Sequence, residues 1–157
     1  MTDFRAAFQL GQEAAMNAEM ARREIDSVFK EINAQLAEPT EGKIEIYRGE
    51  FDKKSSGLFG SLTTSWPISR ETYLAIAARN PKAANRGGVE LARWEVERGG
   101  YPCEVSWGGV EHTCHDRESL EASLALLLKD AIVGEKLRSL MMLPPQTSGK
   151  DGTTGPS

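Results

Sequence analysis

Two Gly-Gly pairs, Gly99-Gly100 and Gly108-Gly109, divide residues 89–115 into three short runs in which apolar and polar side chains alternate. Alternation with a period of two is typical of half-buried β-strands, and glycine accepts the positive φ angles that hairpin turns need. The segment therefore predicts a three-stranded antiparallel meander, which constrains the fold more than any other part of the chain.

The turn positions also fix the pairing of the strands. A two-residue turn at Gly108-Gly109 places Cys103 opposite Cys114. Because Pro102 has no backbone N–H, the first hairpin needs the longer loop Arg98–Tyr101, which leaves the proline beside the loop. A slip by one residue would exchange the two faces of the sheet, so this register is strongly preferred.

In this register one face of the meander is apolar and the other is acidic. The apolar face carries Ala92, Trp94, Val96, Cys103, Val105, Trp107, Val110, His112 and Cys114, and the acidic face carries Arg93, Glu95, Glu97, Glu104, Ser106, Glu111 and Thr113.

Residues 3–37 contain no proline and predict one long helix. At about 1.5 Å per residue it spans roughly 50 Å, which is long enough to overhang a small domain. One line of residues along this helix forms a seam of the kind that packs on another helix. We expect this seam to dock on this protein's own sheet and C-terminal helix, or to pair with a second copy or with a helix of a partner. The seam follows four- and three-residue steps through Phe4, Phe8, Gly11, Ala15, Ala18, Arg22, Ile25, Phe29, Ile32 and Leu36.

The rest of the chain completes an α+β fold of order α-β-β-α-β-β-β-α, with the helices packed on one face of an antiparallel sheet. Strands are expected over 43–48 and 61–66, and a short helix over Arg70–Arg79 that ends at Asn80-Pro81. The N-cap Asp116 begins a helix that runs to about Met141, with Gly134 as the point where it weakens or bends. We expect a single domain over 1–143, whose first helix is long enough to project from it, and a disordered tail over 144–157.

The composition is that of a folded protein, with 39% hydrophobic and 27% charged residues and a formal net charge of −4. A negative chain has no global field that attracts nucleic acid or anionic lipid. No apolar run approaches the roughly 20 residues of a membrane span, and the first residues do not read as a signal peptide. We therefore expect a cytoplasmic protein without a membrane partner, whose partner is a neutral or basic protein.

Cys103, His112 and Cys114 are the residues that most suggest chemistry, since Cys and His are zinc ligands. Three interpretations stay open: a reduced, buried cysteine pair beside a packed histidine, a disulfide, or a metal site. The face offers no fourth ligand, and the spacing matches no zinc motif. No nucleophile motif or phosphate loop is recognisable, since residues 57–60 lack the Lys-Ser/Thr that would follow in a P-loop. We predict no catalytic residues, no cofactor and no enzyme; an enzyme would need His112 or His115 to meet a carboxylate or a metal.

The sequence predicts a non-catalytic protein-binding module, of which an inhibitor or accessory protein of phage or mobile-element type is one form. Its interaction surfaces would be the acidic sheet face, the loop after residue 50 and the long helix, and a homodimer is reasonable. That the acidic face only keeps the domain soluble remains an alternative. The candidate binding residues are Glu95, Glu97, Glu104, Glu111, Phe8, Ala15, Phe51, Lys53, Lys54, Leu58 and Phe59.

Nucleic-acid binding is the alternative that the local basic clusters Arg22-Arg23, Arg48 and Lys53-Lys54 suggest. The expected order over residues 70–141 also resembles the double-stranded-RNA-binding domain, which implies an RNA-binding function. Where that family has a lysine-rich start to its last helix, this chain has Asp116-Arg117-Glu118-Ser119. Over the whole chain, element order and acidity are similar to the class I type III secretion chaperones, which implies a dimer that holds a partly unfolded protein segment.

Overall fold

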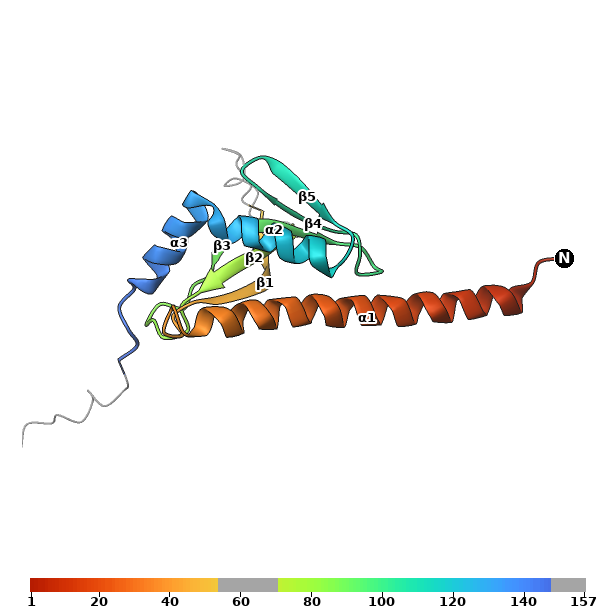
Figure 1. The fold of residues 1–157 in the computed structure, drawn as a ribbon, viewed down its shortest axis with the longest axis horizontal. Helices are drawn as coiled ribbons and strands as arrows, with labels where there is room; N and C mark the ends of the chain where they lie inside the picture. Colours follow the sequence, from red (N-terminus) through yellow and green to blue (C-terminus); the bar gives the residue numbers. More distant parts are fainter. Residues whose placement is uncertain (54–70, 148–157) are drawn as a thin grey trace, which may run out of the picture.

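The computed structural model describes residues 1–53 and 71–147 and has an α+β fold, with helices against one face of a five-stranded antiparallel sheet (Figure 1). Every strand pairs with its neighbours in the chain, so the sheet is a continuous meander of order β1-β2-β3-β4-β5. The predicted class, the long first helix and the C-terminal meander are confirmed. The elements are α1 (Phe4–Ala37), β1 (Glu45–Asp52), β2 (Thr72–Arg79), β3 (Val89–Val96), β4 (Cys103–Trp107), β5 (Val110–Cys114), α2 (Arg117–Lys129) and α3 (Ala131–Met141).

The register predicted for the meander is confirmed. Cys103 lies opposite Cys114 across a tight turn in which Gly108 and Gly109 have φ angles of 60° and 80°. The backbone N–H of Glu97 donates to the carbonyl of Pro102 at 3.4 Å, which leaves the predicted loop of four residues between β3 and β4.

The helix predicted over Arg70–Arg79 is wrong, because this stretch is strand β2. Alanine favours helices, but the strand lies between β1 and β3, and residues 75–78 are fully buried there, at 0% exposure. Small side chains fit a central strand that is covered on both faces, so tertiary pairing overrides the local preference. The described elements therefore follow the order α-β-β-β-β-β-α-α, and the resemblance of residues 70–141 to the double-stranded-RNA-binding domain loses its first helix.

The first predicted strand is confirmed but continues to Asp52, beyond the expected end at residue 48. The strand predicted over 61–66 and most of the tail predicted over 144–157 lie outside the described residues.

The single C-terminal helix that the sequence predicts is divided into α2 and α3. The division falls at Asp130, not at Gly134 where a weak point was expected. Asp130 has an extended backbone (ψ 135°), and its carboxylate accepts hydrogen bonds from the N–H groups of Ile132 and Val133. It thereby caps α3, as Asp116 caps α2 together with Ser119.

The core lies between the sheet and the helices, and α1 contributes only its C-terminal half to it. The ring of Phe29 meets the ring of Trp94 edge-on at 5.8 Å. The Asn33 amide donates to the carbonyl of Ile46 at 2.9 Å and accepts from its N–H at 2.8 Å. Asn33 thus satisfies the backbone of edge strand β1 as a neighbouring strand would, and ties α1 to the sheet.

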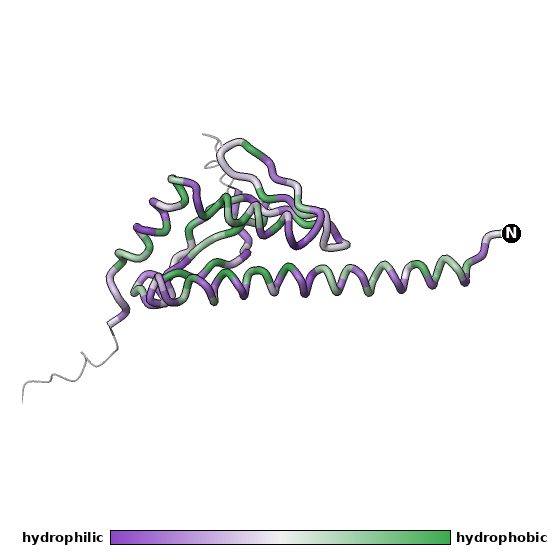
Figure 2. The backbone as a smooth tube through the Cα atoms, in the orientation of Figure 1, coloured by the Kyte–Doolittle hydropathy of each residue, from purple (hydrophilic) through white to green (hydrophobic). Residues whose placement is uncertain are grey.

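The N-terminal half of α1 extends away from the domain (Figure 1). Residues 1–17 are all exposed, and Ala18 is the first buried residue of the helix. Close to this free part the β3–β4 loop contacts α1, where the side chain of Arg22 donates to the carbonyl of Arg98 at 2.9 Å. Hydrophobic residues nevertheless continue along the projecting part, as the green segments of the backbone in Figure 2 show.

Candidate functional site

The face of the sheet opposite the helices has two parts of different chemistry. Over β1 and β2 its aromatic and cationic side chains stack on one another, and over β3 to β5 it is acidic. In the first part, the Arg93 guanidinium lies 4.2 Å from the centre of the Tyr73 ring, and the Tyr73 hydroxyl donates to Glu90 at 2.7 Å. Beside them, Arg79 makes a bidentate ion pair with Glu45 on β1. These contacts leave few unpaired charges on this part.

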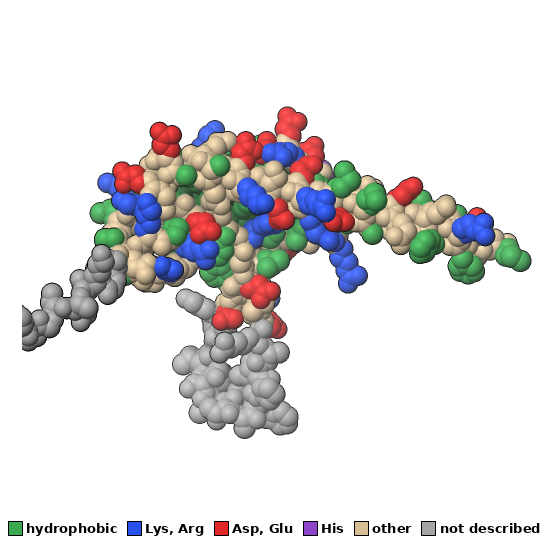
Figure 3. Space-filling view, turned by 90° about the horizontal axis from the view of Figure 1, so that it is seen from below, with side chains coloured by type: hydrophobic (Ala, Val, Ile, Leu, Met, Phe, Trp, Pro, Cys, Tyr) green, Lys and Arg blue, Asp and Glu red, His purple; other side chains and the backbone are tan. Residues whose placement is uncertain are grey.

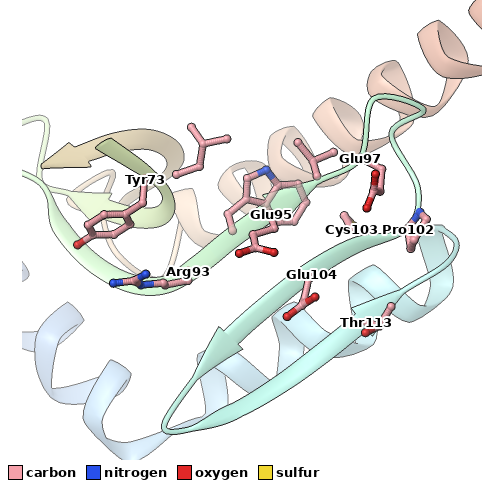
Figure 4. Close-up of a pocket in the computed structure, with 11 residues that line it drawn as sticks. Tyr73, Arg93, Glu95, Glu97, Pro102, Cys103, Glu104 and Thr113 are labelled. Carbon is pink, nitrogen blue, oxygen red and sulfur yellow. The ribbon is translucent and has the colours of Figure 1, made fainter. Parts of the chain in front are cut away.

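A cleft separates the two parts. The ladder between β2 and β3 ends at the pair Ala75 and Arg93, whereas β2 continues along β1 to Thr72 and β3 continues along β4 to Val96. The two ribbons therefore diverge beyond Ala75 and enclose a hollow of about 440 Å³ (Figure 4). Its lining residues are Tyr73, Leu74, Arg93, Trp94, Glu95, Val96, Glu97, Pro102, Cys103, Glu104 and Thr113.

Carboxylates line this cleft from the open face of the sheet, and partly exposed apolar side chains line it from the helix face. Glu95 and Glu104 are direct cross-strand partners, and both side chains stand on the open side of the sheet in Figure 4. Like charges that face each other across strands destabilise a sheet. Leu74 and Val96 are 38% and 41% exposed at the same place. The cleft thus combines negative charge with accessible apolar surface.

The close carboxylates influence one another's protonation. The pKa of Glu104 is raised above its usual value by loss of hydration and by the negative charges of Glu111 and Glu95. The sequence places all three on one face, and the structure confirms that they form a cluster. Glu97 belongs to the loop after β3 and lines the same cleft.

We expect the substitution Glu104→Gln to stabilise the fold at neutral pH and not at low pH. Because the folded-state pKa is raised, wild-type protein loses stability relative to the variant as the pH rises through and above the ordinary carboxyl value of 4.5. Below that range Glu104 is protonated in both the folded and unfolded states, and the two proteins match. Urea unfolding at several pH values measures the difference, and a stability difference that does not change with pH would contradict this origin.

The other predicted binding residues are not gathered at the cleft. Phe51 stacks on Tyr73 with 6.2 Å between ring centres, and Lys53 forms an ion pair with Glu71 at 3.6 Å. Lys54, Leu58 and Phe59 lie outside the described residues. Phe8 and Ala15 are exposed on the projecting part of α1, away from the sheet.

Sequence reasoning missed Tyr73, Leu74 and the cleft itself, since it assigned residues 70–79 to a helix. The short, uninterrupted apolar run from Tyr73 to Ala78 was the signal that could have found them, since such a run is typical of a strand buried on both faces.

Cys103 and Cys114 are free and fully buried. Burial raises the pKa of Cys103 to about 12, so its thiol stays protonated and is a poor nucleophile. The thiol of Cys114 lies 3.3 Å from the hydroxyl of Ser123. Contrary to the expectation of a buried histidine, His112 is half-buried, and its ring stacks on Trp107 at 4.4 Å. Among residues 1–53 and 71–147, no three His, Cys, Asp or Glu side chains form a group that could hold a metal ion.

The described members of the basic clusters each have a partner within the protein. Arg48 pairs with Asp26, Arg23 pairs with Glu19, and Arg22 binds the β3–β4 loop. These contacts lower the positive charge that the clusters can offer to a phosphate backbone.

Comparisons of the chain with models of protein families, with curated proteins and with solved structures find no match. In the described part of the chain, no helix has the length and apolar character needed to cross a membrane.

Proposed function

We propose that this protein is a non-catalytic module that binds a partner protein in the cleft between β2 and β3. The observation that carries the proposal is the combination found there: two glutamates that face each other across β3 and β4 on one side of the cleft, and accessible Leu74 and Val96 on its other side. A carboxylate pair that costs stability is well explained if it meets cations of a partner.

The shape of the cleft suggests what kind of segment it takes. The diverging strands β2 and β3 present backbone edges toward the hollow, and an extended peptide can pair with such an edge while its side chains enter pockets. Lys or Arg side chains on this segment would reach Glu95, Glu97 and Glu104, and apolar side chains would cover Leu74 and Val96. We therefore expect an extended segment of mixed basic and apolar character.

The test compares two charge-reversal variants as baits. The variant Glu95→Lys/Glu104→Lys replaces two negative charges in the cleft by two positive ones. The control variant Glu118→Lys/Glu135→Lys makes the same change in net charge at two exposed glutamates of α2 and α3. Wild-type and variant proteins are immobilised, exposed to extract of the source cell, and the retained proteins are identified by mass spectrometry. We expect a retained partner that the cleft variant loses and the control variant keeps.

If the cleft variant keeps its fold by circular dichroism and retains the same proteins as wild type, the cleft is not the binding site. If both variants lose the partner equally, net charge and not the cleft governs binding, and the proposal is also wrong. A partner that is found can be divided into synthetic peptides, and binding of the basic segment alone would locate the contact.

A further inference from the structure

The projecting part of α1 presents an apolar face that the domain does not cover. Phe4 and Phe8 are 78% and 65% exposed. At 100° per residue, Phe4 and Phe8 lie on the same side of the helix as Ile25 and Phe29, which pack into the core. The face that is buried in the C-terminal half therefore continues unpartnered in the N-terminal half, and Figure 3 shows hydrophobic side chains along it.

We propose that the occupant of this face is the same segment of a second copy, packed antiparallel in a two-fold symmetric dimer. The argument rests on the sizes of the seam residues. Phe4, Phe8, Gly11 and Ala15 follow one another at the four- and three-residue steps of a coiled-coil seam. Two large residues are thus followed by two small ones.

An antiparallel pair centred between residues 9 and 10 brings unlike sizes together. Phe4 then meets Ala15 of the other copy, and Phe8 meets Gly11, so that each ring enters the space that a small residue leaves. Each contact occurs twice, because the arrangement has two-fold symmetry. A parallel pair would instead place Phe8 against Phe8 and Gly11 against Gly11, which leaves crowding in one layer and a void in another.

The positions beside the seam agree with this arrangement. On one side Ala7 of one copy would face Ala14 of the other, and two alanines let the helix backbones come close. On the other side Arg5 would face Gln12, an uncharged acceptor. The seam and its alanine flank carry no charge between residues 4 and 15, so two identical chains meet without repulsion there.

Contacts within the domain favour this register over the register with an overlap longer by seven residues. A longer overlap by one heptad would bring Phe4 of the second copy opposite Arg22, where the side chain of Arg22 binds the β3–β4 loop. It would also bring Phe8 opposite Ala18, which is already buried at 8% exposure. The free length from Phe4 to Ala15 matches the shorter overlap.

The area that this contact can bury sets its strength. A buried aromatic side chain removes about 150–250 Å² from water, so the four phenylalanines of a pair supply roughly 600–1,000 Å². Specific stable interfaces begin near ~1,200 Å² in total, so this contact, with the area that Ala7, Ala14 and Ala15 add, lies at the small end of that range. We expect a reversible dimer whose population rises with protein concentration.

Sedimentation velocity of the full chain over a range of concentrations tests the proposal. We expect a monomer–dimer equilibrium, which Phe8→Ala weakens by about tenfold or more because each dimer loses two aromatic anchors. The matched control is Met16→Ala. Met16 is 66% exposed on the same segment but lies about 80° further around the helix, outside the seam, and its loss should leave the equilibrium unchanged.

Gly11→Leu separates this packing from general stickiness. A side chain at Gly11 meets no atom of its own chain within 4 Å, and leucine favours the helix more than glycine does. Leucine would nevertheless fill the space for Phe8 of the other copy. We expect weaker association although an apolar residue is added; stronger association would overturn the proposal.

Cross-linking determines the orientation. A mixture of the Ala7→Cys and Ala14→Cys variants should form mixed disulfides between the two proteins, while each variant alone should form few. Disulfides of Ala7→Cys with itself would show a parallel pair and refute the geometry.

Wild-type protein that remains monomeric at all concentrations refutes self-association and leaves a helix of another protein as the occupant. The cleft variant Glu95→Lys/Glu104→Lys should dimerise normally, so the dimer and the proposed function are tested separately.

Discussion

Replacing Phe29 by alanine is expected to lower the free energy of unfolding by about 3–5 kcal/mol, the usual range for a large aromatic removed from a core. The Phe29 side chain is 5% exposed and contacts Trp94, and the Arg48 guanidinium lies 4.6 Å from the centre of its ring. Alanine would leave a cavity between α1 and the sheet and remove the aromatic and cation–π contacts together. Urea unfolding followed by tryptophan fluorescence measures the loss.

Phe8→Ala is the control for this prediction, because it makes the same change on the same helix and on the same side of it. Phe8 is 65% exposed, so its removal should change stability by no more than about 0.5 kcal/mol. The measurement is made at low protein concentration, where self-association does not contribute. Equal effects at the two positions would mean that α1 does not project from the domain as described.

Gly100→Ala is expected to destabilise the fold by about 2–5 kcal/mol, through two causes that add. Gly100 has a φ of 87°, and an L side chain in the left-handed region costs about 1–2 kcal/mol. A Cβ atom there would also lie 2.7 Å from the Cβ of Ala21 on α1, and crowding of this kind costs about 1–3 kcal/mol. The close approach holds the β3–β4 loop against the point where α1 leaves the domain.

Gly109→Ala separates the two causes. Gly109 has a similar φ of 80°, but a Cβ atom there would meet nothing within 4 Å. We expect a loss of about 1–2 kcal/mol from the backbone alone. If Gly100→Ala costs no more than Gly109→Ala in chemical denaturation, the contact with Ala21 is not important for stability.

The meander was predictable because its signals are local. The glycine pairs specify where the chain turns, and a period of two then fixes which side chains share a face. The acidic cluster follows from this pattern alone, and Glu95, Glu104 and Glu111 were found in this way. The cap at Asp116 was equally local, since it precedes a run of helix-favouring residues, whereas the second cap at Asp130 was not predicted.

The cleft was not predictable, because it depends on where two ribbons separate. The separation begins where the ladder between β2 and β3 ends, and the register of β2 and β3 shifts between Ile76 and Ala77. No short-range sequence pattern predicts over how many residues two strands remain paired. The alanine-rich stretch at residues 75–78 also favoured a helix locally, and only its burial between β1 and β3 makes it a strand.

Helix α1 shows most clearly which features the sequence determines and which depend on the tertiary structure. The sequence by itself determined that residues 4–37 form one helix with one continuous apolar seam, since periodicity and the absence of proline act within the segment. Only the tertiary structure decided that the seam packs on the domain from Ala18 onward and is open before it, because the sheet and the β3–β4 loop reach no further along the helix. The same kind of residue, Phe8 or Phe29, is therefore a binding candidate at one end and core at the other, since burial depends on neighbours that are distant in the chain.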